Sequence, residues 1–341
     1  MDIRNRRALK ETAAQRLSRA NYDPRKLALI HIGVSAGAAL LITVIDYILA
    51  NQIENTGGLS GMGMRTVLET VQMSLQHIHT IAMPFWQMGF VFVAMQMFRE
   101  KQVRPGSLLE GFRRFGSVLR LRLTEGMLYL AAGMLCMYVG SFVFAVTPYA
   151  APMMELLAPV MEEAATVEQM EAAIAQIPMD TLMASAVPFL VIFGVLFLLL
   201  GACMFYCFRA ADFIVLDQPK LRALPALVIS TRMTKKNRMA WLKLDLSFWW
   251  FYLLYALTIA VGYLDLILPV LGVSLPVSAD AAWFICYILG ILGQVALFWY
   301  ANSYVQTASA AAYEALLQQP QVQPPQKPIP KNLPWDEYNE Q

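Results

Sequence analysis

Charged residues are scarce in this chain. Lys, Arg, Asp and Glu together form 15% of its 341 residues, whereas hydrophobic residues form 58%. Soluble domains have about a quarter charged residues and about half apolar ones, so this composition favours lipid as the surrounding solvent. It also excludes intrinsic disorder for the chain as a whole, because disordered segments are poor in apolar residues.

Cysteine and net charge are low as well. Four Cys are too few for a secreted disulfide scaffold. A net charge of +2 gives no support for a nucleic-acid partner, and we expect none. Cys203 and Cys207 share a helix face without a nearby His or carboxylate, and His77 and His79 would point about 200° apart on a helix. We therefore predict no metal site.

Catalytic motifs are also missing. The sequence has no Gly-rich phosphate loop, no Gly-x-Ser-x-Gly elbow and no His-Glu-x-x-His helix, so an ATP-driven pump or a metalloprotease is disfavoured. We expect no cofactor and favour a protein without enzymatic activity. A lipid-modifying enzyme stays open, because its residues could be scattered along the chain.

Long apolar stretches are abundant. A spanning helix needs roughly 20 apolar residues, because the hydrocarbon core is about 30 Å thick and each residue rises about 1.5 Å. The sequence predicts an all-α, polytopic membrane protein with a six-span domain over residues 27–317. The predicted spans are residues 27–50, 79–98, 125–146, 182–208, 246–270 and 281–304.

The basic residues predict the orientation of these spans. All Lys and Arg except Arg65 lie in residues 1–26, 99–122 and 209–243 or in the C-terminal tail. Basic residues in short loops stay on the cytoplasmic side, so we expect both termini to be cytoplasmic. The opposite loop, residues 147–181, carries six acidic residues and no basic one, which agrees with this topology.

The segments on the basic side share a pattern. The second and fourth spans end in Phe98-Arg99 and Phe208-Arg209, and each is followed by a proline, an amphipathic stretch and a basic cluster. An apolar face too narrow to span a bilayer is typical of helices in the headgroup layer. The apolar positions are Leu108, Phe112, Phe115 and Leu119 in the first copy, Leu221, Leu224 and Val228 in the second, and Leu9, Ala13 and Leu17 in a similar helix within residues 1–26.

We call the basic residues of these segments on the cytoplasmic side the basic collar. Two functions are open for it. It could bind anionic headgroups, at about 1 kcal/mol for each basic residue near the surface, or it could only fix the topology. The candidate lipid contacts are Arg113, Arg114, Arg120, Arg232, Lys235, Lys236 and Arg238. Residues 318–341, rich in Pro and Gln, are predicted to form a disordered cytoplasmic tail.

Polar residues within spans are the candidates for an intramembrane site. Asp46 and Asp265 lie near the outer ends of the first and fifth spans, and they could hold a cation or a proton, or could each be solvated at the interface. Gln87 and Gln294 lie deeper and need hydrogen-bond partners, for which interhelical bonding is the simpler explanation.

Small residues indicate where helices come close together. Gly33 and Gly37 are four residues apart in the first span, and Gly290 and Gly293 lie in the sixth. Such spacing permits close approach of two helix backbones.

Residues 208–250 resemble a bacterial membrane-protein family of unknown function, the domain of unknown function nine-seven-five. The resemblance rests on Ile214-Val215-Leu216-Asp217-Gln218-Pro219 after a span, on the run from Ser230 to Arg238, and on Leu246-Ser247-Phe248-Trp249-Trp250. Lys236 and Trp250 replace glycines of the family pattern. The resemblance implies a six-span integral protein of the bacterial cytoplasmic membrane and brings no established activity, cofactor or catalytic residue.

The turn in this motif also has a local interpretation. Asp217 could accept backbone N–H bonds and Pro219 suits a first helical position. Together they would start the amphipathic helix that follows.

Three functions remain open for the chain. The leading one is a non-enzymatic scaffold or accessory subunit whose collar contacts anionic membrane lipids, with a membrane-protein partner or a second copy of the chain. The second is a transporter of a small solute or lipid, with the four polar span residues lining a path. The third is an enzyme acting on lipid headgroups, with Glu125, Asp245 and Arg209 clustered at the cytoplasmic mouth.

Overall fold

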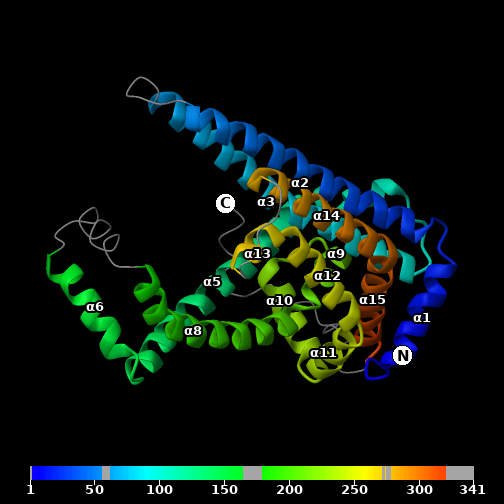
Figure 1. Cartoon of the computed structure of the whole chain (residues 1–341). Coiled ribbons are helices and arrows are strands. Elements are labelled where there is room, and N and C mark those ends of the chain that lie inside the picture. Colours follow the sequence, from blue (N-terminus) through cyan, green and yellow to red (C-terminus); the bar gives the residue numbers. More distant parts are fainter. Residues whose placement is uncertain (1, 56–61, 164–178, 271–272, 274–277, 320–341) are drawn as a thin grey trace, which may run out of the picture. The chain divides into compact units, whose positions relative to one another are not determined.

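A computed structural model describes residues 2–55, 62–163, 179–270, 273 and 278–319, and these residues form helices without strands (Figure 1). The elements are α1 (Arg6–Ser18), α2 (Pro24–Asn55), α3 (Met62–Phe98), η2 (Pro105–Leu109), α4 (Glu110–Arg113), α5 (Phe115–Ala145), α6 (Ala150–Glu163), α8 (Met179–Phe208), α9 (Ala211–Asp217), α10 (Ala223–Thr234), α11 (Arg238–Leu246), α12 (Trp249–Gly262), α13 (Leu264–Val270), α14 (Ala279–Leu297), the π-helical turn η3 (Phe298–Asn302) and α15 (Ser303–Leu317).

The chain divides into two compact units. The first consists of the described parts of Met1–Arg120 and Phe208–Gln341, and the second is Leu121–Cys207. Five helical segments are long and apolar enough to cross a membrane, and a sixth is added if α11 and α12, bent by 62° at a short break, count as one. The predicted all-helical class with several candidate spans is confirmed. The five segments are Pro24–Ile53, Met64–Phe98, Phe115–Ala145, Ala186–Asp217 and Ala281–Leu317.

The predicted span over residues 246–270 is not one continuous helix. Leu246 ends α11, and the Ser247 hydroxyl donates to the Leu244 carbonyl at 2.6 Å. The Ser247 N–H also bonds back to the last turn of α11. These bonds occupy carbonyls at the helix end and so cap it. A second break at Tyr263 separates α12 from α13.

Two other predicted spans lie within longer helices. The helix predicted over residues 79–98 begins already at Met62, and the polar side chains before His79 are accommodated within α3. The helix predicted over residues 281–304 passes through the π-helical turn and runs on to Leu317. Its last part is rich in Ala and mostly buried, so tertiary packing supports it beyond the apolar stretch.

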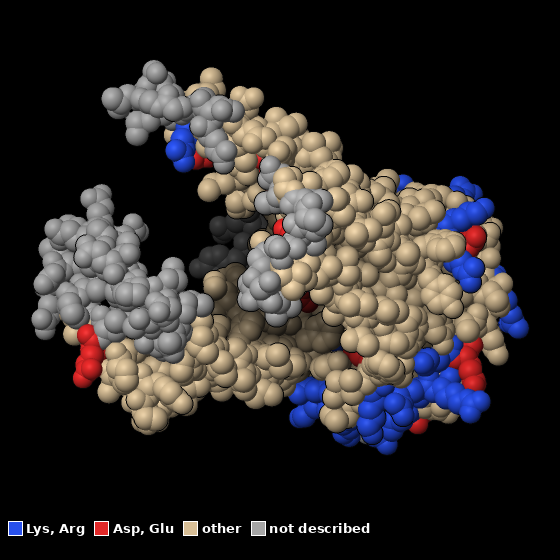
Figure 2. Space-filling view, in the orientation of Figure 1, with Lys and Arg blue, Asp and Glu red and all other residues tan. Residues whose placement is uncertain are grey.

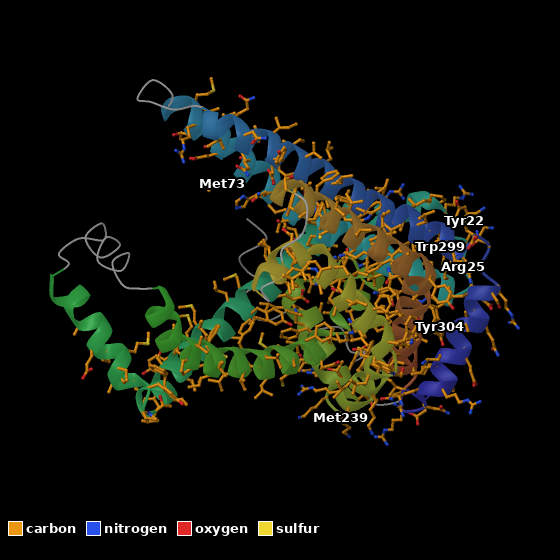
Figure 3. All side chains as sticks on the ribbon, in the orientation of Figure 1. Tyr22, Arg25, Met73, Met239, Trp299 and Tyr304 are labelled. Carbon is orange, nitrogen blue, oxygen red and sulfur yellow. The ribbon has the colours of Figure 1, made fainter. Side chains whose placement is uncertain are left out.

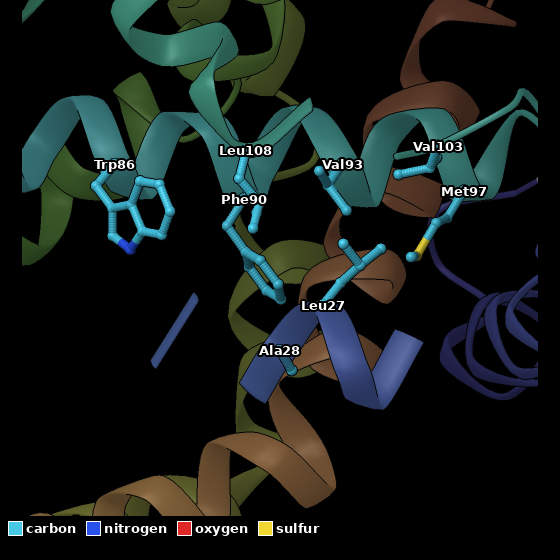
Figure 4. Close-up of a cluster of buried hydrophobic side chains, with 8 residues drawn as sticks. All are labelled: Leu27, Ala28, Trp86, Phe90, Val93, Met97, Val103 and Leu108. Carbon is cyan, nitrogen blue, oxygen red and sulfur yellow. The ribbon is translucent and has the colours of Figure 1, made fainter. Parts of the chain in front are cut away.

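One cluster of buried hydrophobic residues in the first unit lies between α2, α3 and η2 (Figure 4). The Trp86 indole N–H donates to the His31 carbonyl at 2.9 Å, and the two rings stack with centroids 5.5 Å apart. This bond satisfies the one polar atom of a ring that packs in an apolar site. The cluster consists of Leu27, Ala28, Trp86, Phe90, Val93, Met97, Val103 and Leu108.

Glycines allow α3 to touch the segment that follows it. A Cβ atom on Gly89 would lie 1.7 Å from the Leu108 carbonyl oxygen, and one on Gly111 would lie 1.9 Å from the Phe85 carbonyl oxygen. Both positions therefore require Gly, because any other residue would overlap the facing backbone. This reciprocal contact holds η2 and α4 against α3.

In the second unit, one face of α8 packs on α5. Phe189, Phe193 and Phe197 follow each other at four-residue intervals and stack in sequence. A Cβ atom on Gly133 would lie 3.6 Å from Phe197, and one on Gly140 would lie 3.8 Å from Phe193. Small residues on α5 thus make room for the aromatic face of α8.

Candidate functional site

An arginine directly after α3 joins three helices. The Arg99 guanidinium binds both carboxylate oxygens of Asp217, with Nη1–Oδ1 at 2.5 Å and Nη2–Oδ2 at 2.7 Å. Its Nε donates to Glu314 Oε1 at 2.5 Å. The Tyr313 hydroxyl donates to the same Asp217 carboxylate at 3.1 Å. We call Arg99, Asp217, Tyr313 and Glu314 the Arg99 network; it links the end of α3, the end of α9 and α15.

The electrostatics of the Arg99 network are unbalanced. One guanidinium faces two carboxylates, and each of the three charged side chains is only about a fifth exposed. The hydrogen bonds that Arg99 donates to Asp217 raise the pKa of Arg99 further above its already high value, although burial acts in the opposite direction. Arg99 therefore stays charged, and its donors are directed at the carboxylates rather than at solvent.

The arginine after α8 forms a second, similar group. Arg209 Nη2 lies 3.4 Å from Asp245 Oδ1, and its guanidinium lies 5.7 Å from the ring centroid of Trp241. Arg209 and Asp245, two of the residues assigned to an enzymatic site, thus lie together. Glu125 belongs to the second unit, where it pairs with Arg122 at 2.7 Å.

The interpretation of Asp217 and Pro219 as the start of a helix is wrong. Asp217 is the last residue of α9, and α10 begins only at Ala223. The Asp217 carboxylate binds Arg99 instead of backbone N–H groups. Pro219 lies in the connection, where its carbonyl accepts a hydrogen bond from the Ser117 hydroxyl at 2.7 Å. The Asp217 side chain therefore takes part in a long-range ion pair and not in a helix start.

The seven candidate lipid contacts divide into two groups. Arg114 and Arg238 are partly buried, and Arg114 bonds to the Leu216 carbonyl and lies over the Phe92 ring at 5.0 Å. The others are exposed, although Arg113 also pairs with Glu110 at 2.7 Å. The exposed members are Arg113, Arg120, Arg232, Lys235 and Lys236.

The apolar faces of the amphipathic segments also differ. Leu224 and Val228 on α10 are 62% and 48% exposed, and Phe115 at the start of α5 is 49% exposed. Leu9 and Ala13 on α1 are completely buried against the protein. The expectation that the apolar face of α1 lies in the headgroup layer is therefore wrong, because α15 and α3 cover it.

The four polar span residues do not form one cluster. Asp46 Oδ2 accepts a hydrogen bond from Gln76 at 2.9 Å, whereas Asp265 Oδ1 is buried without a partner. Gln87 is exposed. Within the described residues, no hydrogen bond or ion pair joins any two of Asp46, Asp265, Gln87 and Gln294.

Gln294 lines a cavity of about 210 Å³ between α12 and α14. A Cβ atom on Gly290 would lie 2.8 Å from the Gly262 Cα, so the two backbones touch at this level, as the glycine spacing predicted. A Cβ atom on Gly33 or Gly37 would meet nothing within 4 Å. That pair makes no close contact in the described chain. The cavity is lined by Thr258, Ile259, Gly262, Tyr263, Tyr287, Gly290, Ile291 and Gln294.

Sequence reasoning did not mention Glu314, and it noted Tyr313 only in Ala312-Tyr313, which is similar to a closing Phe-Tyr of the family pattern, without giving it a role. The repeated Phe-Arg ending of two spans did mark Arg99 and Arg209, but as topology signals. Within the described ranges, no three His, Cys, Asp or Glu residues lie close enough to hold a metal ion. The arrangement of charged groups therefore joins helices and leaves a separate set of basic residues on the surface.

Residues 1–320 match a family described as protein of unknown function (DUF975). No match was found among curated proteins or among solved structures. The match includes both Phe-Arg endings, the Arg99 network and all the exposed basic residues named above. The chain belongs to the DUF975 family of proteins of unknown function.

Proposed function

We propose that this protein is a six-span protein of the bacterial cytoplasmic membrane, with both termini in the cytoplasm, that acts as a non-enzymatic scaffold or accessory subunit. Its exposed basic residues on the cytoplasmic side bind anionic lipid headgroups. The single observation that carries this proposal is the outer face of α10, which combines exposed apolar and basic side chains.

This face follows helical geometry. Leu224, Val228, Arg232 and Lys235 recur at steps of four, four and three residues, so they lie along one side of α10 and the turn after it. The opposite side is buried, with Ala226 and Met233 inside the protein. Water is a poor environment for the exposed apolar half of such a face, whereas the boundary between acyl chains and headgroups suits both halves.

The distribution of charge supports the same placement. On the face shown in Figure 2, Lys and Arg gather over α1 and α11, whereas the long flanks of α2 and α14 carry almost none. Near an anionic surface each basic residue contributes about 1 kcal/mol, so the five exposed candidates together would contribute about 5 kcal/mol. Met239, in the first turn of α11, is also exposed, at 62% (Figure 3).

Lipid binding is tested on the full chain reconstituted in nanodiscs that contain phosphatidylcholine and phosphatidylglycerol. Mass spectrometry of the retained lipids measures the enrichment of phosphatidylglycerol. We expect the Arg232→Gln/Lys235→Gln variant to lose most of this enrichment. The matched control is Arg65→Gln/Arg25→Gln, which removes two charges elsewhere. Equal enrichment of phosphatidylglycerol in both variants would refute the proposal that the basic residues of α10 bind anionic lipid.

The topology is tested by labelling with a membrane-impermeant maleimide, in a background that lacks the four native Cys. We expect Lys235→Cys to react only from the cytoplasmic side and Glu155→Cys only from the outside. The reverse pattern would contradict the orientation.

One observation favours transport as a second candidate. Gln294 borders the cavity together with the hydroxyl-bearing Thr258 and Tyr287, and Tyr287 in turn bonds to Thr43 on α2 at 2.9 Å. These uncharged polar groups could guide a small polar solute. Transport predicts that Gln294→Leu abolishes uptake in a liposome assay while it leaves the folded fraction unchanged.

A further inference from the structure

The N-terminal helix borders a concave surface that no part of the proposed collar uses. Ile3, Leu9 and Ala13 are completely buried and fix α1 on the protein. The polar side of α1 then faces the end of α11 and Tyr304 of α15 (Figure 3). The space between them is an open, shallow cavity on the surface with a volume of about 790 Å³. Its lining is Asp2, Arg4, Asn5, Arg6, Arg7, Lys10, Glu11, Ala14, Ser247 and Tyr304.

The lining has an excess of positive charge. Arg7 pairs with Glu11 at 2.8 Å, so these two side chains neutralise each other. Arg4, Arg6 and Lys10 remain against Asp2, which leaves a balance of +2. The Asp2 carboxylate accepts a hydrogen bond from the Arg4 backbone N–H at 3.0 Å, so one of its oxygens is already engaged.

The basic side chains still have donors to offer. Lys10 Nζ lies 4.5 Å from the centre of the Phe248 ring and 3.4 Å from the Ser247 carbonyl oxygen. Arg6 reaches the Lys243 carbonyl with one nitrogen at the long distance of 3.5 Å. These contacts hold both cations at the rim of the cavity and use few of their N–H groups. The Arg4 guanidinium has no side-chain partner among the described residues.

A ligand for this lining must supply acceptors and negative charge. Arginine forks fit phosphate oxygens with paired hydrogen bonds, and a phosphomonoester carries about −1.5 to −2 charges at neutral pH. That charge balances the +2 of the lining. Since the apolar face of α1 is buried against the protein, the helix presents its polar side, which carries Arg6 and Lys10, to this lining.

We propose that the cavity between α1 and the end of α11 binds a phosphomonoester group, with Arg4, Arg6 and Lys10 as its ligands. The group could belong to a lipid such as phosphatidic acid or to a soluble phosphate compound, because the lining recognises the phosphate itself. This site is separate from the exposed face of α10, so the two proposals can fail independently.

The test measures binding to the full chain in phosphatidylcholine nanodiscs by calorimetry, with inorganic phosphate as one probe and nanodiscs containing phosphatidic acid as the other. Saturation by inorganic phosphate indicates a soluble source, and saturation by phosphatidic acid alone indicates a lipid source. Either result supports the site. Absence of saturable binding with both probes would overturn it.

Variants locate the site on the chain. We expect Arg4→Gln/Arg6→Gln to weaken binding about tenfold or more, because two charge-assisted contacts are lost. The control Arg16→Gln/Arg19→Gln removes the same charge from residues outside the lining, and should leave binding within about twofold. If both double variants weaken binding equally, only net charge matters and the site is refuted.

A variant that should bind phosphate more tightly serves as a control, because a loss of folding cannot produce tighter binding. Asp2→Asn removes the remaining negative charge of the lining and should lower the dissociation constant severalfold. Unchanged or weaker binding would contradict the proposed charge balance. Enrichment of phosphatidylglycerol by α10 should be unaffected in all these variants, which separates this test from that of the collar.

Discussion

Removal of the Arg99 side chain should destabilise the protein more than removal of any exposed arginine. In Arg99→Met, the carboxylates of Asp217 and Glu314 remain side by side, each only about a fifth exposed and without a cation. Breaking a buried ion pair by removing one partner costs about 3–5 kcal/mol. Because solvent reaches a fifth of each side chain, we expect the lower end of that range, about 3 kcal/mol.

The assay is thermal unfolding of the full chain in a mild detergent, followed by circular dichroism. A loss of about 3 kcal/mol corresponds to a decrease in Tm of about 6–12 °C for a unit of this size. Arg113→Met is the control, because its ion pair with Glu110 involves an arginine that is 64% exposed and is worth about 0.5 kcal/mol.

A double-mutant cycle isolates the pair itself. We expect a coupling energy of at least about 1.5 kcal/mol between Arg99→Met and Asp217→Asn. Either variant alone already breaks the bidentate contact, so the double variant does not lose that contact a second time. The reasoning is refuted if the coupling is zero, or if Arg99→Met and Arg113→Met lower Tm equally.

Three further predictions concern single positions. Tyr313→Phe should cost about 1.5 kcal/mol, because one hydrogen bond to a charged group disappears; unfolding in detergent measures it, and no change would mean that solvent replaces the hydroxyl. Gly89→Ala should prevent stable folding because its Cβ would lie 1.7 Å from a carbonyl oxygen, whereas Gly33→Ala meets nothing within 4 Å and should retain the wild-type Tm; equal Tm values would show that α3 and η2 are not in contact. The stabilisation due to Arg99 should not change between about pH 7 and about pH 10. Folding raises the pKa of Arg99, so its stabilisation is complete at every pH below the pKa of the unfolded state. It is lost only when the pH rises through the pKa of the folded state, which lies above this range. A Tm difference between wild type and Arg99→Met that shrinks over this range would contradict it.

The spans could be predicted from the sequence because hydropathy is a local property. Apolar stretches of about 20 residues identify candidate spans whatever they pack against. The break at Ser247 was missed, because a capping hydroxyl in an apolar neighbourhood has little effect on hydropathy. The extension of the last helix to Leu317 was also missed. Its Ala-rich sequence gives no strong hydropathy signal, and the segment is helical because it is buried against α1.

The partners of the interior charges could not be predicted. Arg99 binds residues that are 118 and 215 positions away in the sequence. No periodicity links such distant positions, so the choice of carboxylate depends on how α3, α9 and α15 pack. For the same reason the sequence assigned Asp217 to a local helix start, which is the nearest role that an Asp before Pro suggests.

The Phe-Arg pairs at the ends of α3 and α8 can be explained by the partners of their arginines. Each arginine follows the last residue of a long apolar helix, where neighbouring helices remove it from water. A cation in that position needs a carboxylate, and each of the two arginines pairs with an Asp, Arg99 with Asp217 and Arg209 with Asp245. The two carboxylates come from different helices. The need of each arginine for a carboxylate therefore recurs, whereas the arrangement of helices around it does not. Basic residues beside a membrane therefore belong to two populations, and only those not held by an interior carboxylate can turn their donors to phosphate or lipid.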